Sequence, residues 1–329
     1  MPKIDFLTRN AQATPAVEQF AHDVQYYLTQ QPRQLPSRYL YDALGSALFD
    51  AICRMPWYGV TRAELRLLEA HAGSILALAR PFASIVELGP GSGEKLATLI
   101  EVAPTGRDRL HVYLVDVSPS ALALATRTLR GLDEELRIVA HEAPYETGLR
   151  EVMRQARNAG RTLVLFLGSN IGNFDRPATE AFLRGMRAAL APGDVFLVGA
   201  DLVKPEADLL LAYDDPLGIT AAFNRNLLYR INRELGGDFD VPQFAHRAVW
   251  NAAESRVEMH LVALRRQRVR VASAEIDITI EAGETIWTES SYKFRPDDIA
   301  LRLQQTGFSV ERQWIDRDDG FALTAAGAV

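Results

Sequence analysis

The sequence predicts an α/β fold, in which a mostly parallel sheet is covered on both faces by helices, joined to a second lobe. Short apolar segments alternate with amphipathic segments from residue 84 to residue 199. A glycine-rich loop at 89–93 follows the first apolar segment. After Asp201 the alternation stops, and residues 245–294 form longer runs rich in valine, threonine and aromatic residues, a pattern typical of antiparallel strands.

The alternating part predicts five strands with helices between them. Each strand is a short apolar run, as expected for a parallel sheet that is buried on both faces. Pro119 stands where the first turn of a helix accepts a proline. The predicted strands are 84–88, 111–117, 136–140, 163–167 and 195–199, and the predicted helices are 94–102, one from Pro119 and one around 179–190.

The other segments predict a helical N-terminal arm, an inserted lobe and a closing hairpin. The first sixty residues read as helical pieces around aromatic side chains, and residues 62–80 read as one amphipathic helix. The elements expected after Asp201 are helices within 205–235 and at 296–305, the antiparallel strands of 245–294, and a hairpin of 308–317 with 320–325.

The domain boundaries follow from these changes of pattern. We expect residues 62–201 and 293–329 to form the domain that contains the parallel sheet. Residues 1–61 and 202–292 are expected to pack together as a second lobe.

The composition argues against several classes of function. The chain has 329 residues, with 36 lysines and arginines against 42 aspartates and glutamates, so its net charge is −6. This charge argues against nonspecific binding to nucleic acid or to an anionic membrane. No run of about twenty apolar residues could span a bilayer. The six histidines lack metal-ligand spacing, and no cysteine cluster accompanies them, so we predict no metal site.

The sequence also gives expectations for the cellular location and the oligomeric state of the protein. Residues 1–9 lack the apolar stretch of a signal peptide, and the single cysteine, Cys53, allows no intramolecular disulfide. We therefore expect a cytoplasmic protein, and we expect it to be a monomer.

The strongest motif is the segment from Val86 to Lys95, with the sequence VELGPGSGEK, between a predicted strand and a predicted helix. A dinucleotide site has G-x-G-x-x-G, and here the third glycine comes one residue early. A P-loop has G-x-x-x-x-G-K-[ST], and here the lysine is misplaced and the hydroxyl is missing. An acidic residue before G-x-G-x-G resembles instead the motif of class I S-adenosylmethionine-dependent methyltransferases. The residues that this resemblance places at the cofactor are Glu87, Gly89, Gly91 and Gly93.

The next predicted strand ends near Asp116, 23 residues after Gly93. A carboxylate there can accept hydrogen bonds from both ribose hydroxyls of an adenosine. Dinucleotides carry the same hydroxyls, so the glycine spacing, and not Asp116, distinguishes the two cofactors. From the residues alone, a tight turn at the glycines and a carboxylate at a helix N-terminus stay as alternatives.

Motifs spread over nearly the whole chain carry a more specific resemblance. They are YDALGSALF at 41–49, TRAE at 61–64, GSNIGNF at 168–174, YDD at 213–215, TAAFN at 220–224, NRELG at 232–236, RVEMHL at 256–261 and ETIWTESSYKF at 284–294. In this order they resemble the histidine Nα-methyltransferase family of ergothioneine biosynthesis. That family trimethylates the α-amine of L-histidine to hercynine with three molecules of S-adenosylmethionine. The resemblance implies a Rossmann-like class I methyltransferase domain with a substrate-binding lobe.

The resemblance implies that Asn173 and Tyr213 bind the carboxylate of the substrate. Asn173 follows the fourth predicted strand, at the edge where open α/β sheets bind ligands. From the residues alone, a turn-forming asparagine and a core tyrosine are the alternative.

The resemblance also implies that Glu289 and Ser291 bind the imidazole and that Met259 lies beside it. If 285–293 is a strand, Trp287, Glu289 and Ser291 share one face. A glutamate and a serine can grip both nitrogens of an imidazole, one as acceptor and one as donor. The alternatives are a solvated polar face that includes Lys293, and a plain core position for Met259.

Three aromatic residues of the arm match family positions near the substrate. The resemblance implies that Tyr58 contacts the imidazole, that Phe49 forms an aromatic wall and that Tyr41 lies near the reacting amine. Tyr41 is our candidate for handling the amine proton, through water. A hydrophobic core is the alternative for all three. Lys95 matches a cofactor contact, with an exposed lysine in a first helical turn as its alternative.

The chain departs from the family pattern at two places. Members have Asp-Phe or Asp-Tyr after the third strand, where the Asp accepts the adenine amine, and this chain has Ala143-Pro144-Tyr145. A proline side chain offers no hydrogen bond, so adenine is expected to stack on Tyr145, with Glu142 as a substitute acceptor. After Tyr58 this chain has Gly59-Val60, where many family members have Tyr-Pro. This difference reshapes the mouth of the expected pocket and could relax the preference for histidine.

Other functions are compatible with parts of the pattern. An enzyme that methylates the α-amine of another amino acid would use the same carboxylate clamp. Glu289 argues against an apolar ring, because burial of an unpaired carboxylate is costly. Pro144 leaves room for a protein that binds S-adenosylmethionine without turnover. An NAD-dependent dehydrogenase is disfavoured by the glycine spacing.

Overall fold

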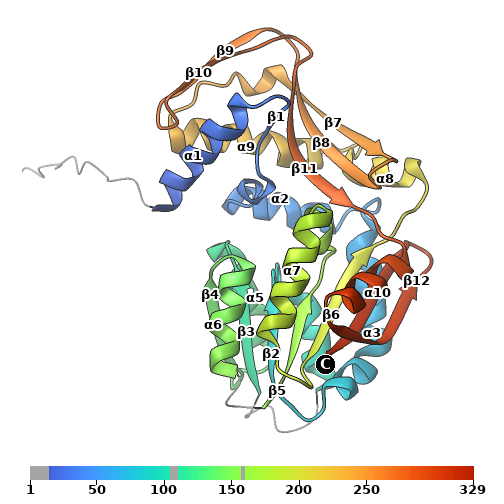
Figure 1. Ribbon diagram of the computed structural model, residues 1–329. Helices are drawn as coiled ribbons and strands as arrows, with labels where there is room; N and C mark the ends of the chain where they lie inside the picture. Colours follow the sequence, from blue (N-terminus) through green and yellow to red (C-terminus); the bar gives the residue numbers. More distant parts are fainter. Residues whose placement is uncertain (1–14, 104–109, 157–159) are drawn as a thin grey trace, which may run out of the picture.

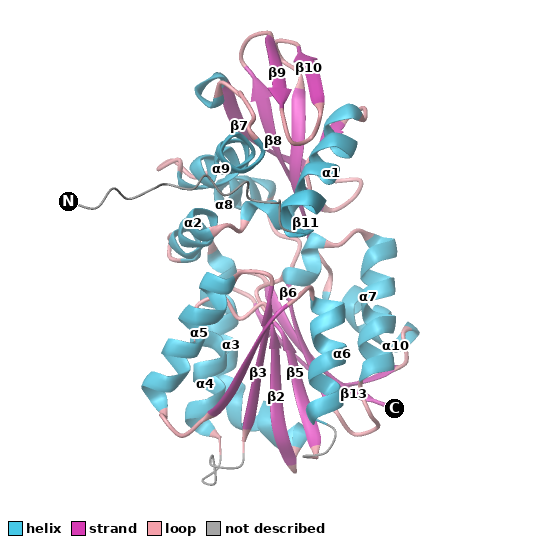
Figure 2. Ribbon diagram, turned by 90° about the vertical axis from the view of Figure 1, so that its left-hand side faces the viewer, coloured by secondary structure: helices cyan, strands magenta, loops and turns pink. Residues whose placement is uncertain are grey.

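The computed structural model describes residues 15–103, 110–156 and 160–329, which form two lobes stacked one on the other (Figures 1 and 2). One lobe contains a seven-stranded sheet, and the other contains a four-stranded sheet and a two-stranded hairpin. The N-terminal residues on which the signal-peptide prediction rests lie outside the described residues.

The seven-stranded sheet has the strand order β12-β13-β6-β5-β2-β3-β4. Strands β2 to β6 pair in parallel, whereas β13 lies antiparallel between β6 and β12. The alternating pattern and the closing hairpin therefore predicted the fold class correctly. The strands are β2 (Phe82–Leu88), β3 (His111–Asp116), β4 (Arg137–Glu142), β5 (Arg161–Phe166), β6 (Val195–Asp201), β12 (Phe308–Asp316) and β13 (Phe321–Ala328).

Helices cover both faces of this sheet, as Figure 2 shows. Successive strand residues point to opposite faces, so Ile85 belongs to one core cluster and Val86 to the other. On one face lie α3 (Gly59–Ala79), α4 (Glu94–Val102) and α5 (Pro119–Leu132), and on the other lie α6 (Tyr145–Ala156), α7 (Arg176–Ala189) and α10 (Pro296–Gln305).

Local sequence signals explain where these helices begin. The hydroxyl of Ser118 accepts a hydrogen bond from the amide of Ala121 and so caps α5, with Pro119 in its first turn. Asp175 caps α7 in the same way. Helix α6 has no counterpart among the predicted elements, although its buried residues follow helical spacing. Those residues are Leu149, Val152, Met153 and Ala156.

The other lobe is built on the sheet β1-β11-β8-β7. Its strands are β1 (Arg33–Gln34), β7 (Phe244–Asn251), β8 (Arg256–Ala263) and β11 (Thr285–Tyr292), and β9 (Gln267–Val271) pairs with β10 (Ile276–Ile280). Helix α2 of the arm packs against α9, and β1 of the arm pairs in parallel with β11. The helices are α1 (Pro15–Thr29), η1 (Ser37–Leu40), α2 (Ala43–Cys53), α8 (Glu206–Tyr213), α9 (Ile219–Leu235) and η4 (Val241–Gln243).

Within the described ranges, none of the helices combines the length and the apolar character needed to cross a bilayer. In the same ranges, no group of three or more histidine, cysteine, aspartate or glutamate side chains is arranged to hold a metal ion.

Candidate active site

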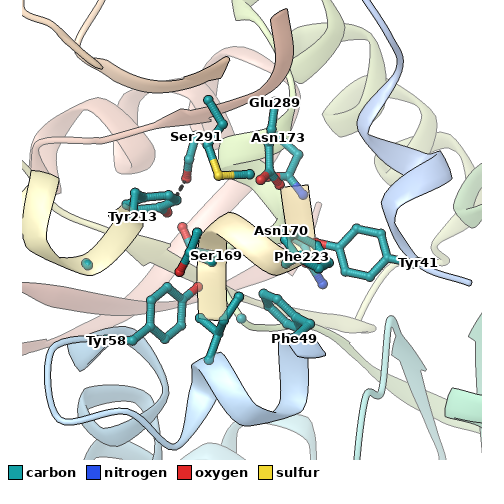
Figure 3. A pocket seen from close by; sticks show the side chains of 15 residues that line it. Tyr41, Phe49, Tyr58, Ser169, Asn170, Asn173, Tyr213, Phe223, Glu289 and Ser291 are labelled. Carbon is teal, nitrogen blue, oxygen red and sulfur yellow. Dashed lines mark hydrogen bonds between the residues drawn. The ribbon is translucent and has the colours of Figure 1, made fainter. Parts of the chain in front are cut away.

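A pocket lies between the two lobes, at the carboxyl ends of the parallel strands (Figure 3). The loop after β5, with the short helix η3 (Asn170–Asn173), forms one side, and α8, α9, β8 and β11 form the opposite side. Open α/β sheets bind ligands at this edge. All eight residues predicted for substrate binding or proton handling line the pocket, namely Tyr41, Phe49, Tyr58, Asn173, Tyr213, Met259, Glu289 and Ser291.

Seven further residues line the pocket and were not predicted as site residues. Several of them belong to the motifs 168–174 and 220–224, so a signal for them was present in the sequence. Ser169 adopts a φ of 57°, and its hydroxyl accepts a hydrogen bond from the amide of Asp201 at 2.9 Å, which ties the loop to β6. The seven are Ile52, Gly168, Ser169, Asn170, Ala212, Thr220 and Phe223.

Aromatic side chains from the arm and from α9 form one wall. The ring centroids of Tyr41 and Phe49 are 5.5 Å apart, and that of Phe223 lies 5.5 Å from Tyr41 and 5.9 Å from Phe49. Asp42 caps α2 and also accepts a hydrogen bond from the side-chain amide of Asn226 at 2.7 Å. This contact anchors the segment that carries Tyr41 to α9.

A β-bulge at Thr288 decides which residues of β11 reach the pocket. Trp287 pairs with His260 and Glu289 pairs with Met259, so Thr288 is an extra residue in the ladder. Opposite residues in a ladder share a face, so Glu289 faces the pocket with Met259 while Trp287 stacks on His260 on the other face. The prediction that Trp287 and Glu289 share one face is therefore wrong.

Ser291 lies beyond the bulge and shares the pocket face with Glu289. The hydroxyl of Tyr213 donates a hydrogen bond to Ser291 Oγ at 2.7 Å, which Figure 3 shows as a dashed line. The ammonium of Lys293 donates to both hydroxyls, at 2.8 and 2.9 Å, and lies 2.8 Å from Asp201 Oδ2. The Lys293 side chain has no solvent exposure, which rules out a solvated polar face here.

Burial shifts the pKa values of the titratable groups in the pocket. It raises the pKa of Glu289 to about 7, against the opposing effect of Lys293. Burial, reinforced by the charge of Glu289, raises the pKa of Tyr41 well above its usual value. Tyr41 therefore keeps its proton, and Glu289 exchanges between charged and neutral forms near neutral pH.

The glycine-rich loop after β2 has a backbone that only glycine adopts without strain. Gly89 and Gly93 have φ values of 74° and 81°. A Cβ on Gly93 would lie 2.9 Å from the Cα of Ala125, and a Cβ on Gly89 would lie 2.9 Å from the hydroxyl of Tyr145. The loop thus packs closely on α5 and on the start of α6, beside the pocket.

Two carboxylates end the strands next to this loop. Both oxygens of Glu87 are buried without a hydrogen-bond partner among the described residues, and burial raises its pKa to about 8. Asp116 accepts a hydrogen bond from the amide of Ser118 at 2.8 Å, and burial raises its pKa to about 6. Buried carboxylates of this kind are stabilised by a ligand that donates hydrogen bonds.

Lys95 was predicted as a cofactor contact, and the structure pairs it with Glu64. Their Nζ and Oε2 atoms are 2.6 Å apart, and the Glu64 side chain has no solvent exposure. The same carboxylate accepts hydrogen bonds from the amide of Gly168 at 2.8 and 2.9 Å. Glu64 was not predicted as a site residue, although it lies in the motif 61–64.

The segment expected near adenine keeps Tyr145 close to the loop. The ring of Tyr145 packs edge-on against Phe166, with centroids 5.2 Å apart. Glu142 is exposed and lies opposite Asp116 in the strand ladder. The carbonyl of Pro144 accepts a hydrogen bond from the amide of Gly148, so Pro144 helps to form the first turn of α6.

Comparison with known proteins decides the family. The family described as "Histidine-specific methyltransferase, SAM-dependent" matches residues 20–328. The chain belongs to this family. The histidine N-alpha-methyltransferase of Mycobacterium tuberculosis is 41% identical over 305 residues, which cover 92% of this chain and 93% of the relative.

Two fungal relatives have lower sequence identity to this chain. Ergothioneine biosynthesis protein 1 of Neurospora crassa is 28% identical over 274 residues, which cover 78% of this chain and 31% of that protein. The 4-dimethylallyltryptophan N-methyltransferase of Penicillium roqueforti is 25% identical over 301 residues, which cover 87% of each chain.

As a member of this family, the chain is a methyltransferase that uses S-adenosylmethionine, as its glycine loop predicted. The residues around the loop fit this cofactor. Its ammonium group and ribose hydroxyls are hydrogen-bond donors. The buried oxygens of Glu87 lack such a donor, and Asp116, which accepts from the amide of Ser118, has lone pairs left for further donors. The family excludes the dehydrogenase alternative.

Proposed function

We propose that this chain transfers three methyl groups from S-adenosylmethionine to the α-amine of L-histidine and so forms hercynine, in ergothioneine biosynthesis. The observation that carries the proposal is the pair Glu289 and Ser291 on one pocket face of β11 (Figure 3). One is an acceptor and the other a donor, as the two nitrogens of a neutral imidazole require. The name of the Mycobacterium tuberculosis relative supports the same substrate.

The opposite part of the pocket suits the amino-acid end of the substrate. Asn173 projects from η3 at the carboxyl end of β5, and its amide can donate to a carboxylate. Tyr213 of α8 lies on the same pocket, with its ring 6.2 Å from that of Tyr58. We assign the carboxylate to Asn173 and Tyr213, and we assign the sides of the ring to Met259 and Tyr58.

The cofactor is assigned to the neighbouring glycine loop. When bound, S-adenosylmethionine supplies a methyl group on a positively charged sulfur, which a neutral amine can attack directly. We propose that Glu87 accepts from its ammonium, that Asp116 accepts from its ribose hydroxyls and that Tyr145 stacks on its adenine. The loop residues Gly89, Gly91 and Gly93 allow the methionine part to approach the backbone. We also propose that Lys95 contacts the cofactor.

Methyl transfer requires the amine without its extra proton. The first and second transfers each leave the nitrogen as a charged ammonium with one proton in excess, and this proton must leave before the next transfer. Tyr41 is protonated and partly buried, so it cannot act as an anionic base. We propose that its hydroxyl relays the proton to water by accepting one hydrogen bond while donating another. Much of the rate acceleration then comes from orientation of the amine.

The proposal is tested by incubating the protein with S-adenosylmethionine and an equimolar set of the twenty amino acids, followed by mass spectrometry. A gain of three methyl groups on histidine alone is expected. Methylation of another amino acid would keep the cofactor and the carboxylate clamp but reject the imidazole assignment. Binding of S-adenosylmethionine without any methylated product would reject catalysis.

A further inference from the structure

Asn224, on α9, is fully buried, and its side-chain amide contacts three strands of the four-stranded sheet. Its Oδ1 accepts a hydrogen bond from the hydroxyl of Thr288, on β11, at 2.6 Å. Its Nδ2 has two N–H groups and two neighbours. These are the ring nitrogen Nδ1 of His246, on β7, at 2.9 Å and the carbonyl of His260, on β8, at 3.2 Å. Each polar atom of this amide therefore has its partners inside the lobe.

The neighbours of the amide decide the direction of each hydrogen bond. The carbonyl of His260 can only accept, so the amide atom beside it must be the donor Nδ2. Nδ1 of His246 then accepts from the other N–H of Asn224. The second ring nitrogen, Nε2, lies 2.8 Å from the carbonyl of Tyr213, which also can only accept. His246 is therefore neutral, with its proton on Nε2.

This chain of hydrogen bonds ends at the two subsites that hold the proposed substrate. Thr288 is the extra residue of the β-bulge and directly precedes Glu289, which is assigned to the imidazole. Tyr213 is the last residue of α8 and is assigned to the substrate carboxylate. We call the chain Thr288–Asn224–His246–Tyr213 the buried bridge. It uses the carbonyl of Tyr213, so it leaves the hydroxyl of Tyr213 available to the substrate.

We propose that Asn224 and His246 are positioning residues that fix the separation between the ring subsite at Glu289 and the carboxylate subsite at Tyr213. The inference rests on the proposed function, because the ring and the carboxylate are those of bound histidine. The two subsites belong to different elements, β11 and α8, and the buried bridge joins them through α9 and β7. A substrate whose two ends match a fixed separation makes both contacts at once, and this orients its amine for methyl transfer.

The surroundings of His246 favour the neutral ring that the buried bridge requires. The side chain of His246 is only 1% exposed. Burial lowers the pKa of His246, against the opposing effects of the Tyr213 carbonyl and of Asp214. The other charged groups that face the ring are Asp215, which follows α8, and Arg225, on α9. A second proton, on Nδ1, would point at an N–H of the side-chain amide and break the bridge.

Asn224→Asp tests the buried bridge with almost no change in side-chain volume. A carboxylate oxygen replaces Nδ2, so the side chain has no proton to donate to His246 or to the carbonyl of His260. The KM for L-histidine is expected to rise at least about tenfold, because the two subsites are no longer held at one separation. Binding of S-adenosylhomocysteine is expected to stay unchanged. Steady-state kinetics and calorimetric titration measure these values, after circular dichroism has checked folding.

A double-mutant cycle distinguishes positioning from a general loss of structure. If Asn224 acts through Glu289, then Asn224→Asp should raise the KM less than about threefold in the Glu289→Gln background, where the ring contact is already weakened. Ile280→Ala is the stability control, at a buried position of β10, in the part of this lobe far from the parallel sheet (Figure 1). It should lower the melting temperature and leave the KM for L-histidine unchanged.

The outcomes separate the inference from the function on which it rests. An unchanged KM in Asn224→Asp, or a rise that is equally large in the Glu289→Gln background, overturns the inference while methylation of histidine by the wild type stands. Failure of the wild type to methylate histidine rejects the proposed function and the inference with it. If Asn224→Asp does not fold, Thr288→Val decides in the same cycle, because it keeps the branched shape and removes the hydroxyl that donates to Asn224.

Discussion

Glu64 Oε2 lies 2.6 Å from Lys95 Nζ, in a position where the glutamate side chain has no contact with solvent. The same carboxylate accepts hydrogen bonds from the amide of Gly168, in the loop that carries Asn173. This charge pair between α3 and α4, with Glu64 fully buried and Lys95 20% exposed, therefore connects the glycine-rich loop with the loop that carries Asn173. We therefore expect a substitution of Glu64 to weaken the binding of both the cofactor and the substrate.

Glu64→Gln is expected to destabilise the protein by about 3 kcal/mol, because it leaves the largely buried Lys95 ammonium without its counter-ion. It is also expected to weaken binding of S-adenosylhomocysteine by at least about tenfold. Urea unfolding and calorimetric titration measure the two effects. Glu69→Gln, an exposed change on the same helix, is the control and should alter neither value. Unchanged cofactor binding in Glu64→Gln would show that the pair serves stability alone.

Glu289→Gln is expected to change stability and substrate binding in opposite directions. Burial raises the pKa of Glu289 to about 7, above its value in the unfolded chain, so the stabilising protonated form is lost as the pH rises from about 4.5 through 7. At pH 8 the variant should exceed the wild type in free energy of unfolding by on the order of 1–2 kcal/mol, and at pH 4.5 the two should agree.

Substrate binding supplies the second half of this prediction. At pH 8 the KM for L-histidine should rise at least about tenfold in Glu289→Gln, because an amide replaces the charged acceptor of the ring N–H. Steady-state kinetics and urea unfolding across this pH range provide the measurements. Glu281→Gln, at an exposed position in the same lobe, is the control. A variant less stable than the wild type at pH 8 contradicts the pKa shift.

Tyr41→Phe tests the proton relay. At pH 7 kcat is expected to fall roughly 10- to 100-fold, since the amine loses its route for the departing proton. The loss should become smaller at pH 9.5, where more of the free amine is already neutral. Rate profiles over pH for both proteins measure this. Tyr26→Phe, at an exposed tyrosine, should leave the profile unchanged. A loss of activity that is the same at every pH would assign Tyr41 to packing.

Gly93→Ala and Gly91→Ala separate backbone strain from steric clash. Both glycines have positive φ, but a Cβ on Gly93 would lie 2.9 Å from Ala125, whereas a Cβ on Gly91 would meet nothing within 4 Å. Gly91→Ala is expected to cost about 1 kcal/mol of stability through strain. Gly93→Ala should cost about 1–2 kcal/mol more and abolish measurable binding of S-adenosylhomocysteine. Equal effects of the two changes would exclude the close packing on α5 as the cause.

The fold class was predictable because its signals are local. Short apolar runs, the proline of α5 and the glycine loop each act within about ten residues, and they located the parallel strands and most helices. Helix α6 was not predicted although Leu149 and Met153 carry its apolar stripe, because Pro144 and Gly148 near its start favour a turn. The division into two domains, the monomeric state and the cytoplasmic location stay predictions.

The residues that line the pocket were predictable only through the family motifs. The β-bulge and the long-range ion pairs around the pocket were not predictable. Family resemblance named eight lining residues, and the structure brings all eight together. The bulge at Thr288 reverses the face of Trp287, and strict alternation along a strand cannot show such an extra residue. The buried partners of Lys293 and Glu64 come from β6 and from the loop after β5, and no spacing in the sequence reveals such long-range pairs.

The pairing of β1 with β11 has a consequence for the order of folding. Arg33 and Glu284, which are 251 positions apart, form an ion pair beside this pairing at 2.6 Å. Contacts of such separation form late and slow the folding of a chain. On the ribosome, the arm with Tyr41 and Phe49 emerges before β11 and must wait for it before the pocket can close. A nascent chain therefore completes this pocket only after β11 has left the ribosome.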